Sequence, residues 1–134
     1  MPISHLTFRC GQSPSWQEAV TTGLQQVLEQ TFAVPPGDCF QVLHEVAAHQ
    51  LRYDRHYLTS ERGANWLLIE ITAGKPRSLE TKRTFYRALA ARLAHDPGLA
   101  PADLMVVIRH NQAEDWSFGL GRMSMLPDEE GISC

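Results

Sequence analysis

The sequence predicts an α+β fold, of the layered α/β kind, in which one β-α-β unit occurs twice and forms a four-stranded sheet with two helices on one face. The order strand, helix, strand can be read in each half of the chain. The segment Val-Pro-Pro-Gly-Asp at 34–38 has a counterpart, Leu-Ala-Pro-Ala-Asp at 99–103, at an offset of 65 residues. Each expected helix has a single apolar stripe, so the helices can cover only one face of the sheet.

In the first half, the apolar run at residues 3–8 predicts a strand, and residues 11–14 predict a turn. Ser13 or Ser15 can cap the helix that follows. This helix ends before the Pro-Pro pair at 35–36, and residues 39–46 predict the second strand. The apolar stripe of the helix recurs at steps of three and four residues, at Trp16, Val20, Leu24, Val27, Leu28 and Thr31.

The second half repeats this plan. Residues 65–72 predict a strand, 73–74 a turn, 78–94 a helix and 104–110 the fourth strand. Because a helix joins the two strands of each unit, these strands should be parallel, with a right-handed crossover. We expect residues 51–65 to be irregular and residues 111–134 to form a tail, with one short extended stretch near 120–125.

A chain of 134 residues fits one domain, spanning 1–134, with repeat halves of about 2–60 and 65–125. The uncovered sheet face belongs to strands that are rich in apolar residues, so it should not be wet. We therefore expect a symmetric oligomer with this face in its interior.

Composition narrows the function classes. The chain is 43% hydrophobic and 20% charged, with a net charge of −3 and no basic patch that argues for nucleic acid, so we expect a globular protein that binds no nucleic acid. The apolar runs are too short to span a membrane, and the first 30 residues lack the pattern of a signal peptide, so we expect a cytoplasmic protein. Cys10, Cys39 and Cys134 are odd in number and widely spaced, and the histidines are scattered. We expect no metal site, and we expect Cys10 and Cys39 to be buried.

Pro2 is the first candidate catalytic residue. Removal of Met1 would leave a proline secondary amine at the start of the first strand. Amino-terminal amines titrate at about 7.7 to 8.0, so such a group can act as an acid, a base or a nucleophile near neutral pH. Proline is also common at position 2 of proteins, in which case Pro2 has no chemical role.

Charged residues supply the other candidates. Lys75 and Arg77 precede the second helix, where free N–H groups and the side chains can bind a carboxylate together. Arg77 is the stronger candidate because a guanidinium grips a carboxylate with two parallel bonds; alternatively, both are solvated surface charges. Asp38 can orient water or a protonated amine, but its repeat counterpart Asp103 favours a role in the turn.

Two aromatic residues form a further candidate. Trp116 and Phe118 lie two positions apart before Gly119 and share a face if the segment is extended. They can line an apolar pocket, or they can fill the core or a subunit interface.

Four segments together resemble the tautomerase superfamily, and within it malonate semialdehyde decarboxylases in particular. They are Met1-Pro2, Val-Pro-Pro-Gly-Asp at 34–38, Lys-Pro-Arg at 75–77 before Ser-Leu-Glu-Thr-Lys, and Asp-Trp-Ser-Phe-Gly at 115–119. The resemblance extends from Pro2 to about residue 121. It implies a tautomerase-like homotrimer that needs no cofactor.

The resemblance also assigns roles. It implies that Pro2 is the catalytic amine and polarises a substrate carbonyl, that Asp38 assists with proton or water placement, and that Arg77 holds the substrate carboxylate. Trp116 and Phe118 correspond to aromatic pocket residues. Lys75 stands where the family pattern has a second arginine.

Because Lys75 replaces an arginine of the family pattern, the sequence does not decide which reaction the protein catalyses. Lysine keeps the charge but lacks the planar two-pronged grip that would align the carboxylate for carbon–carbon cleavage. The first hypothesis is therefore a lyase that decarboxylates malonate semialdehyde or a similar short oxo acid. The second is an isomerase, a keto-enol tautomerase of an α-keto acid such as phenylenolpyruvate. The third is a non-catalytic trimeric binding protein that has kept the fold.

Overall fold

The computed structural model describes residues 1–127. Its elements follow the predicted order in both halves. The strands are β1 (Pro2–Arg9), β2 (Gln41–Val46), β3 (Leu67–Ala73) and β4 (Leu104–His110), and the helices are α1 (Pro14–Thr31) and α2 (Leu79–His95). Three short 3-10 helices follow β2, precede β4 and follow β4, at Ala48–Gln50, Pro101–Asp103 and Ala113–Asp115.

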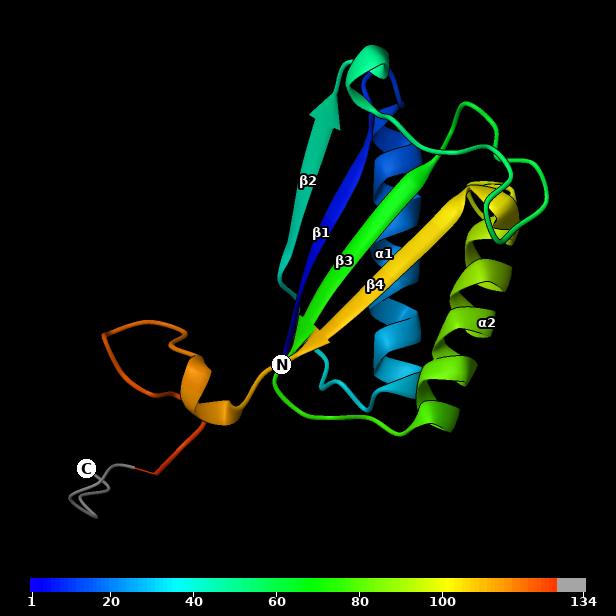
Figure 1. The fold of residues 1–134 in the computed structure, drawn as a ribbon. Coiled ribbons are helices and arrows are strands. Elements are labelled where there is room, and N and C mark those ends of the chain that lie inside the picture. The colour runs from blue at the N-terminus through cyan, green and yellow to red at the C-terminus, as the bar shows by residue number, and fades with distance from the viewer. Residues whose placement is uncertain (128–134) are drawn as a thin grey trace.

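The sheet has the order β2-β1-β3-β4. The two strands of each unit are parallel, as predicted, and the two units meet through antiparallel pairing of β1 with β3. In this pairing Pro2 lies opposite Ala73. Figure 1 accordingly shows the amino terminus at the end of the sheet where β3 and β4 finish. The start of the first strand and the loop into α2 therefore share one end of the molecule.

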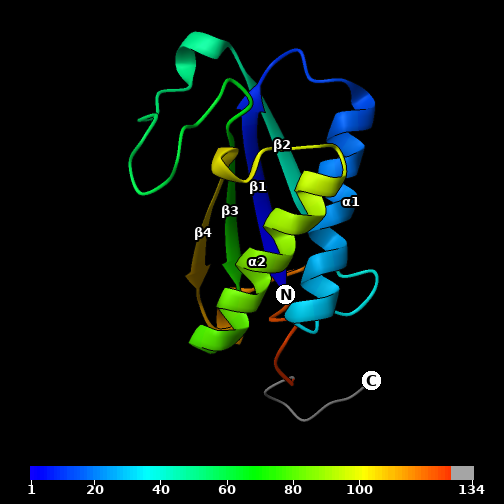
Figure 2. The same cartoon turned by 90° about the vertical axis from the view of Figure 1, so that its right-hand side faces the viewer.

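Both helices lie on one face of the sheet, and Figure 2 shows the molecule from this side, with α2 in front of the strands. Each helix is preceded by a capping serine whose hydroxyl accepts a hydrogen bond from the backbone N–H three residues on. Ser13 accepts from Trp16 N and Ser78 from Thr81 N, both at 3.1 Å. The core fills the space between the helices and the sheet. Its buried members are Leu6, Phe8, Val20, Leu24, Val27, Leu28, Phe32, Val34, Leu67, Ile69, Ile71, Phe85, Leu89, Leu93 and Leu99.

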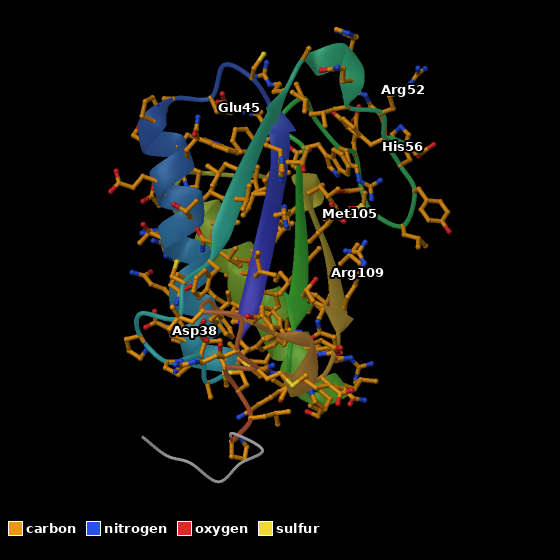
Figure 3. All side chains as sticks on the ribbon, turned by 90° about the vertical axis from the view of Figure 1, so that its left-hand side faces the viewer. Asp38, Glu45, Arg52, His56, Met105 and Arg109 are labelled. Carbon is orange, nitrogen blue, oxygen red and sulfur yellow. The ribbon has the colours of Figure 1, made fainter. Side chains whose placement is uncertain are left out.

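The open face of the sheet is less apolar than the sequence suggests. A polar row crosses it from β2 to β4. His44 and His5 stack and share a hydrogen bond of 2.8 Å between ring nitrogens. His5 pairs in register with Glu70, and Glu70 Oε2 forms an ion pair of 3.0 Å with Arg109 Nη2. Figure 3 shows Met105 and Arg109 on this face. Alternating side chains explain the row, because only every second residue of each strand belongs to the core.

Two smaller expectations are wrong. Residues 120–125 form turns and bends rather than an extended stretch; two glycines with positive φ, Gly119 and Gly121, flank Leu120, which also has positive φ. Cys10 and Cys39 are exposed rather than buried, because both lie just outside strands. Cys134 lies outside the described residues. No helix within residues 1–127 is long and apolar enough to cross a membrane.

Candidate active site

The amino terminus is held inside the molecule. The Met1 amino group lies 2.6 Å from Oδ2 of Asp38, and the Met1 carbonyl accepts a 3.1 Å hydrogen bond from Gly74 N. Met1 is 9% exposed. The β1–β3 pairing positions this group, because it sets Pro2 beside Ala73, the residue before Gly74.

Asp38 reaches the amino terminus from a turn that precedes β2. Asp38 N donates to Pro35 O at 3.1 Å, and Gly37 has a φ of 92°, a conformation that glycine adopts without strain. Gln25 of α1 donates to the Asp38 carbonyl at 3.2 Å. These bonds fix the backbone, so the carboxylate is directed at the start of β1.

Asp103, the repeat counterpart of Asp38, has a comparable place in the second half. Asp103 is buried, and its Oδ1 accepts a 2.6 Å hydrogen bond from Gly63 N, shortly before β3. Each aspartate thus binds a nitrogen of the chain that leads into the first strand of its unit. Both carboxylates bind a nitrogen far away in the sequence and, among residues 1–127, neither accepts a hydrogen bond within its own turn, so the turn role expected from the repeat is not observed. Only Asp38 meets a charged amine.

Arg77 lies at the entrance to α2. Its guanidinium donates from Nη1 to Lys75 O at 2.7 Å and from Nη2 to Phe32 O at 3.1 Å. It also lies over the Phe32 ring, 4.8 Å from the centroid. Burial lowers the pKa of Arg77, and the negative charge of Asp38 partly opposes this shift. Two carbonyls use only part of the donor set of a guanidinium, which leaves further N–H groups for a ligand.

These residues surround one small cavity of about 280 Å³. Asp38, Lys75 and Arg77 provide its charged groups, and Met1 lies in its wall. The structure thus brings three of the predicted site residues together around the start of β1. The other lining residues are Phe32, Ala33, Val34, Pro35, Pro76 and Met125.

The two aromatic residues occupy different positions. Their rings stack at 5.5 Å with an interplanar angle of 13°, so they share a face as predicted. Trp116 lies beside Gly74, the residue before Lys75, because a Cβ placed on Gly74 would be 2.8 Å from its Nε1, but Trp116 does not line the cavity. Phe118 lies farther out, against Phe40, and lines a separate cavity of the tail.

The sequence did not reveal three features of this site. A Cβ on Gly74 would come within 2.6 Å of Met1 Cε and 2.8 Å of Trp116 Nε1, so these side chains would have to shift. Phe32 belongs to the core cluster and also supports Arg77. Met125 reaches the cavity from the tail. Their apolar or small side chains gave no chemical signal in the sequence. Within residues 1–127, no group of three or more His, Cys, Asp or Glu side chains could hold a metal ion.

Comparison with known proteins gives consistent results. The model of the Tautomerase_2 family, described as tautomerase enzyme, matches residues 38–119. Two proteins of Bacillus subtilis (strain 168) are similar over 126 residues, which is 94% of this chain. The probable tautomerase YusQ is 32% identical over 99% of its own length, and the probable tautomerase YrdN is 33% identical over 97% of its length.

Solved structures share the fold. A structure of malonate semialdehyde decarboxylase superposes with a TM-score of 0.86 and 25% identity, covering 92% of this chain and 95% of that chain. The FG41 malonate semialdehyde decarboxylase gives 0.85 and 24% over 91% and 92%. A fused 4-OT, described as a symmetric trimer, gives 0.75 and 22% over 92% and 96%. The fold predicted from the sequence is confirmed.

Proposed function

This chain belongs to the tautomerase enzyme family, and we propose that it is a cofactor-free enzyme whose catalytic group is the amine of Pro2 after removal of Met1. One observation carries the proposal. Met1, the residue before β1, lines one cavity together with the carboxylate of Asp38 and the cations of Lys75 and Arg77, and its amino group pairs with Asp38. An amine in this position would meet both a proton acceptor and groups that bind an organic acid.

The proposal depends on Met1 removal for a chemical reason. While Met1 is attached, the nitrogen of Pro2 is an amide nitrogen with no proton and no useful basicity. Removal would convert this atom into a secondary amine and vacate the volume that Met1 fills in the cavity wall. The carboxylate of Asp38, now paired with the Met1 amino group at 2.6 Å, would then be available to the new amine.

We propose decarboxylation of malonate semialdehyde or a similar short oxo acid as the reaction. Arg77, with support from Lys75, would bind the carboxylate. Pro2, as a cation or through an imine, would draw electrons towards the aldehyde carbon. The bond to the carboxylate carbon would break and carbon dioxide would leave. The electron pair of the broken bond would form an enol or enamine. A proton, placed with help from Asp38, would then bind to the carbon that has lost the carboxylate. On the enol route this gives the aldehyde product. On the imine route it gives an iminium, and one water, equivalent to the water lost when the imine formed, would hydrolyse it to the aldehyde and the free Pro2 amine.

The alternative reaction is keto-enol tautomerisation of an α-keto acid such as phenylenolpyruvate. Two observations support it: Lys75 is a point charge without a forked grip, and both bacterial relatives are named probable tautomerases. In this reaction Pro2 would move one proton as a base, and no carbon–carbon bond would break. Trp116, beside Gly74, would contact the apolar part of the substrate, and Phe118 would extend this wall through its stacked ring.

We propose a homotrimer as the assembly. The fused 4-OT structure with the same fold is a symmetric trimer, and the helices here leave one sheet face uncovered (Figure 3). Met105 on this face is 41% exposed in the single chain. Light scattering during gel filtration tests the proposal, and a monomer at micromolar concentration would contradict it. A cytoplasmic location stays a prediction.

The reaction is tested on material whose intact mass shows that Met1 is absent. Malonate semialdehyde and phenylenolpyruvate are supplied separately, and carbon dioxide release is compared with loss of enol absorbance. Material that retains Met1 is the matched control, since it differs by one residue and lacks the proline amine. Equal turnover by both materials would exclude Pro2 as the catalytic group. Failure of the Met1-free protein to turn over either compound would favour the non-catalytic binding protein.

A further inference from the structure

The internal repeat gives the sheet two comparable ends. Because β1 and β3 are antiparallel, each end combines the start of one central strand with the end of the other. The short helices that follow β2 and β4, Ala48–Gln50 and Ala113–Asp115, are 65 residues apart. At the same offset Leu51 corresponds to Trp116 and Tyr53 to Phe118. The end of the sheet opposite Met1 therefore carries counterparts of the aromatic residues near the candidate active site.

A second cavity, of about 710 Å³, lies at this opposite end. This volume is within the range of about 300–1,000 Å³ that is typical of ligand pockets. Arg9, the last residue of β1, lines it, together with His49 of the short helix and three residues of the segment after it, Arg52, Tyr53 and Arg55. Figure 3 shows Arg52 at the opposite end of the sheet from Asp38. The eight residues of β1 separate the two ends by roughly 23 Å at about 3.3 Å per residue.

The charge of this cavity is uncompensated. Its lining contains three arginines and no carboxylate. None of these arginines forms an ion pair within the described part of the chain. Arg9 donates to the neutral amide of Asn65 at 3.0 Å, and Arg55 donates to the backbone carbonyl of Arg62 at 3.0 Å. Grouping these cations in a chain of net charge −3 makes a local field that attracts anions.

The nearest acid in the sequence does not neutralise the group. Asp54 accepts backbone hydrogen bonds from His56 and Tyr57 through one oxygen, both at 2.8 Å. Its carboxylate is therefore directed at the turn of its own loop. Arg52 forms no hydrogen bond or ion pair through its side chain among residues 1–127, and its side chain is exposed.

The cavity also offers an apolar surface. Leu51 lines it beside Tyr53. The Tyr53 ring is fixed, since its hydroxyl donates to Gly63 O at 2.7 Å and the ring stacks on Trp66 at 4.7 Å. A cationic rim over a fixed apolar wall suits an anion that has an organic body.

We propose that this cavity is a second ligand site, which binds a small organic anion with two or more negative charges carried by phosphate or carboxylate groups. Each guanidinium can hold such a group through two parallel hydrogen bonds. A ligand with several charges would neutralise arginines that face the same cavity. The site lacks a strand-terminal amine, so it binds without the reaction proposed for Pro2. This inference does not depend on that reaction.

The test measures binding of pyrophosphate and of citrate to the full chain by calorimetry, with sodium chloride keeping the ionic strength constant. Arg52→Gln is the principal variant, because this exposed side chain supports no other part of the fold. Arg55→Gln is the second variant. Arg87→Gln, an exposed arginine on α2, is the control with the same change in charge. We expect saturable binding that Arg52→Gln weakens about tenfold or more and Arg87→Gln leaves unchanged.

The outcomes distinguish phosphate ligands from carboxylate ligands, and they distinguish support for the proposal from its rejection. Saturable binding of pyrophosphate alone assigns the site to phosphates, and binding of citrate alone assigns it to carboxylates; both support the proposal. Three results would overturn it: no saturable binding of either anion, an equal loss in Arg52→Gln and Arg87→Gln, or a loss in Lys75→Gln instead. The last result would place the anion in the cavity near Met1.

Discussion

The amino group of Met1 and the carboxylate of Asp38 form an ion pair of 2.6 Å with side chains that are only 6% and 19% exposed. Water screens such a pair less than it screens a surface pair, and the hydrogen bond is charge-assisted. The same carboxylate belongs to the cavity lined by Lys75 and Arg77. The state of the amino terminus thus determines what Asp38 binds.

In the chain that retains Met1, Asp38→Asn should lower the free energy of unfolding by about 1 to 3 kcal/mol, since it leaves a partly buried ammonium without its charged partner. Urea denaturation of material with a verified intact mass measures this change. Glu80→Gln is the matched control, because Glu80 is 77% exposed and pairs only with Arg83 on the surface. Its effect should stay below about 0.5 kcal/mol. Equal effects would show that the Met1 pair is no stronger than a surface pair.

Lys75→Arg should favour decarboxylation over tautomerisation. A guanidinium supplies the forked grip that lysine lacks, so the substrate carboxylate would be aligned better for cleavage. We expect kcat/KM for malonate semialdehyde to rise about tenfold relative to kcat/KM for phenylenolpyruvate. Lys82→Arg, on α2, tests for an unspecific effect of arginine. If Lys75→Arg leaves the ratio of the two activities unchanged, Lys75 does not decide the reaction.

Gly74→Ala should destabilise the chain that retains Met1 by about 1 to 3 kcal/mol, because the added Cβ would come within 2.6 Å of Met1 Cε and 2.8 Å of Trp116 Nε1. In material without Met1 the first of these clashes is absent, so the loss of stability should be smaller. Thermal unfolding of both materials measures the difference, and tryptophan fluorescence reports movement of Trp116. A loss that does not depend on Met1 would assign the whole effect to Trp116.

Asp54→Ala should destabilise the protein in a pH-dependent way. Backbone hydrogen bonds from His56 and Tyr57 lower the pKa of Asp54 below its usual value of 3.8. A lowered pKa in the folded state contributes stability that is present above pH 3.8 and is lost as the pH falls through the folded value. The wild type and Asp54→Ala should therefore differ in urea midpoint at pH 7 and converge as the pH falls below 3.8. A difference that persists at low pH would contradict this, and Glu61→Ala is the exposed control.

The sequence predicts the elements well because their signals are local. The apolar stripe of α1 and the serine caps Ser13 and Ser78 are readable from spacing alone. The pairing of β1 with β3 is a long-range contact, and no short motif specifies it. The turns at 120–125 were not predicted. Apolar residues in this segment favour an extended stretch when the contacts of the segment are unknown.

The charged residues of the candidate site could be predicted from the sequence, whereas its uncharged residues Phe32, Gly74 and Met125 could not. Asp38, Lys75 and Arg77 line one cavity. Their individual roles, and those of Pro2, Trp116 and Phe118, stay predictions. The contacts of Arg77 with two backbone carbonyls could not be foreseen, because they depend on the path of the chain at Phe32.

The antiparallel pairing of β1 with β3 makes the two halves of the chain mutually dependent. Pro2 comes from the first half of the chain and Ala73, which precedes the loop into α2, from the second, yet Pro2 and Ala73 are partners in the sheet. A fragment that ends near residue 60 would hold the amine and Asp38 but no cation from the α2 entrance. Mixing this fragment with a second fragment that contains the rest of the chain would restore the cavity only if the two associate. Recovery of turnover would therefore report their association directly.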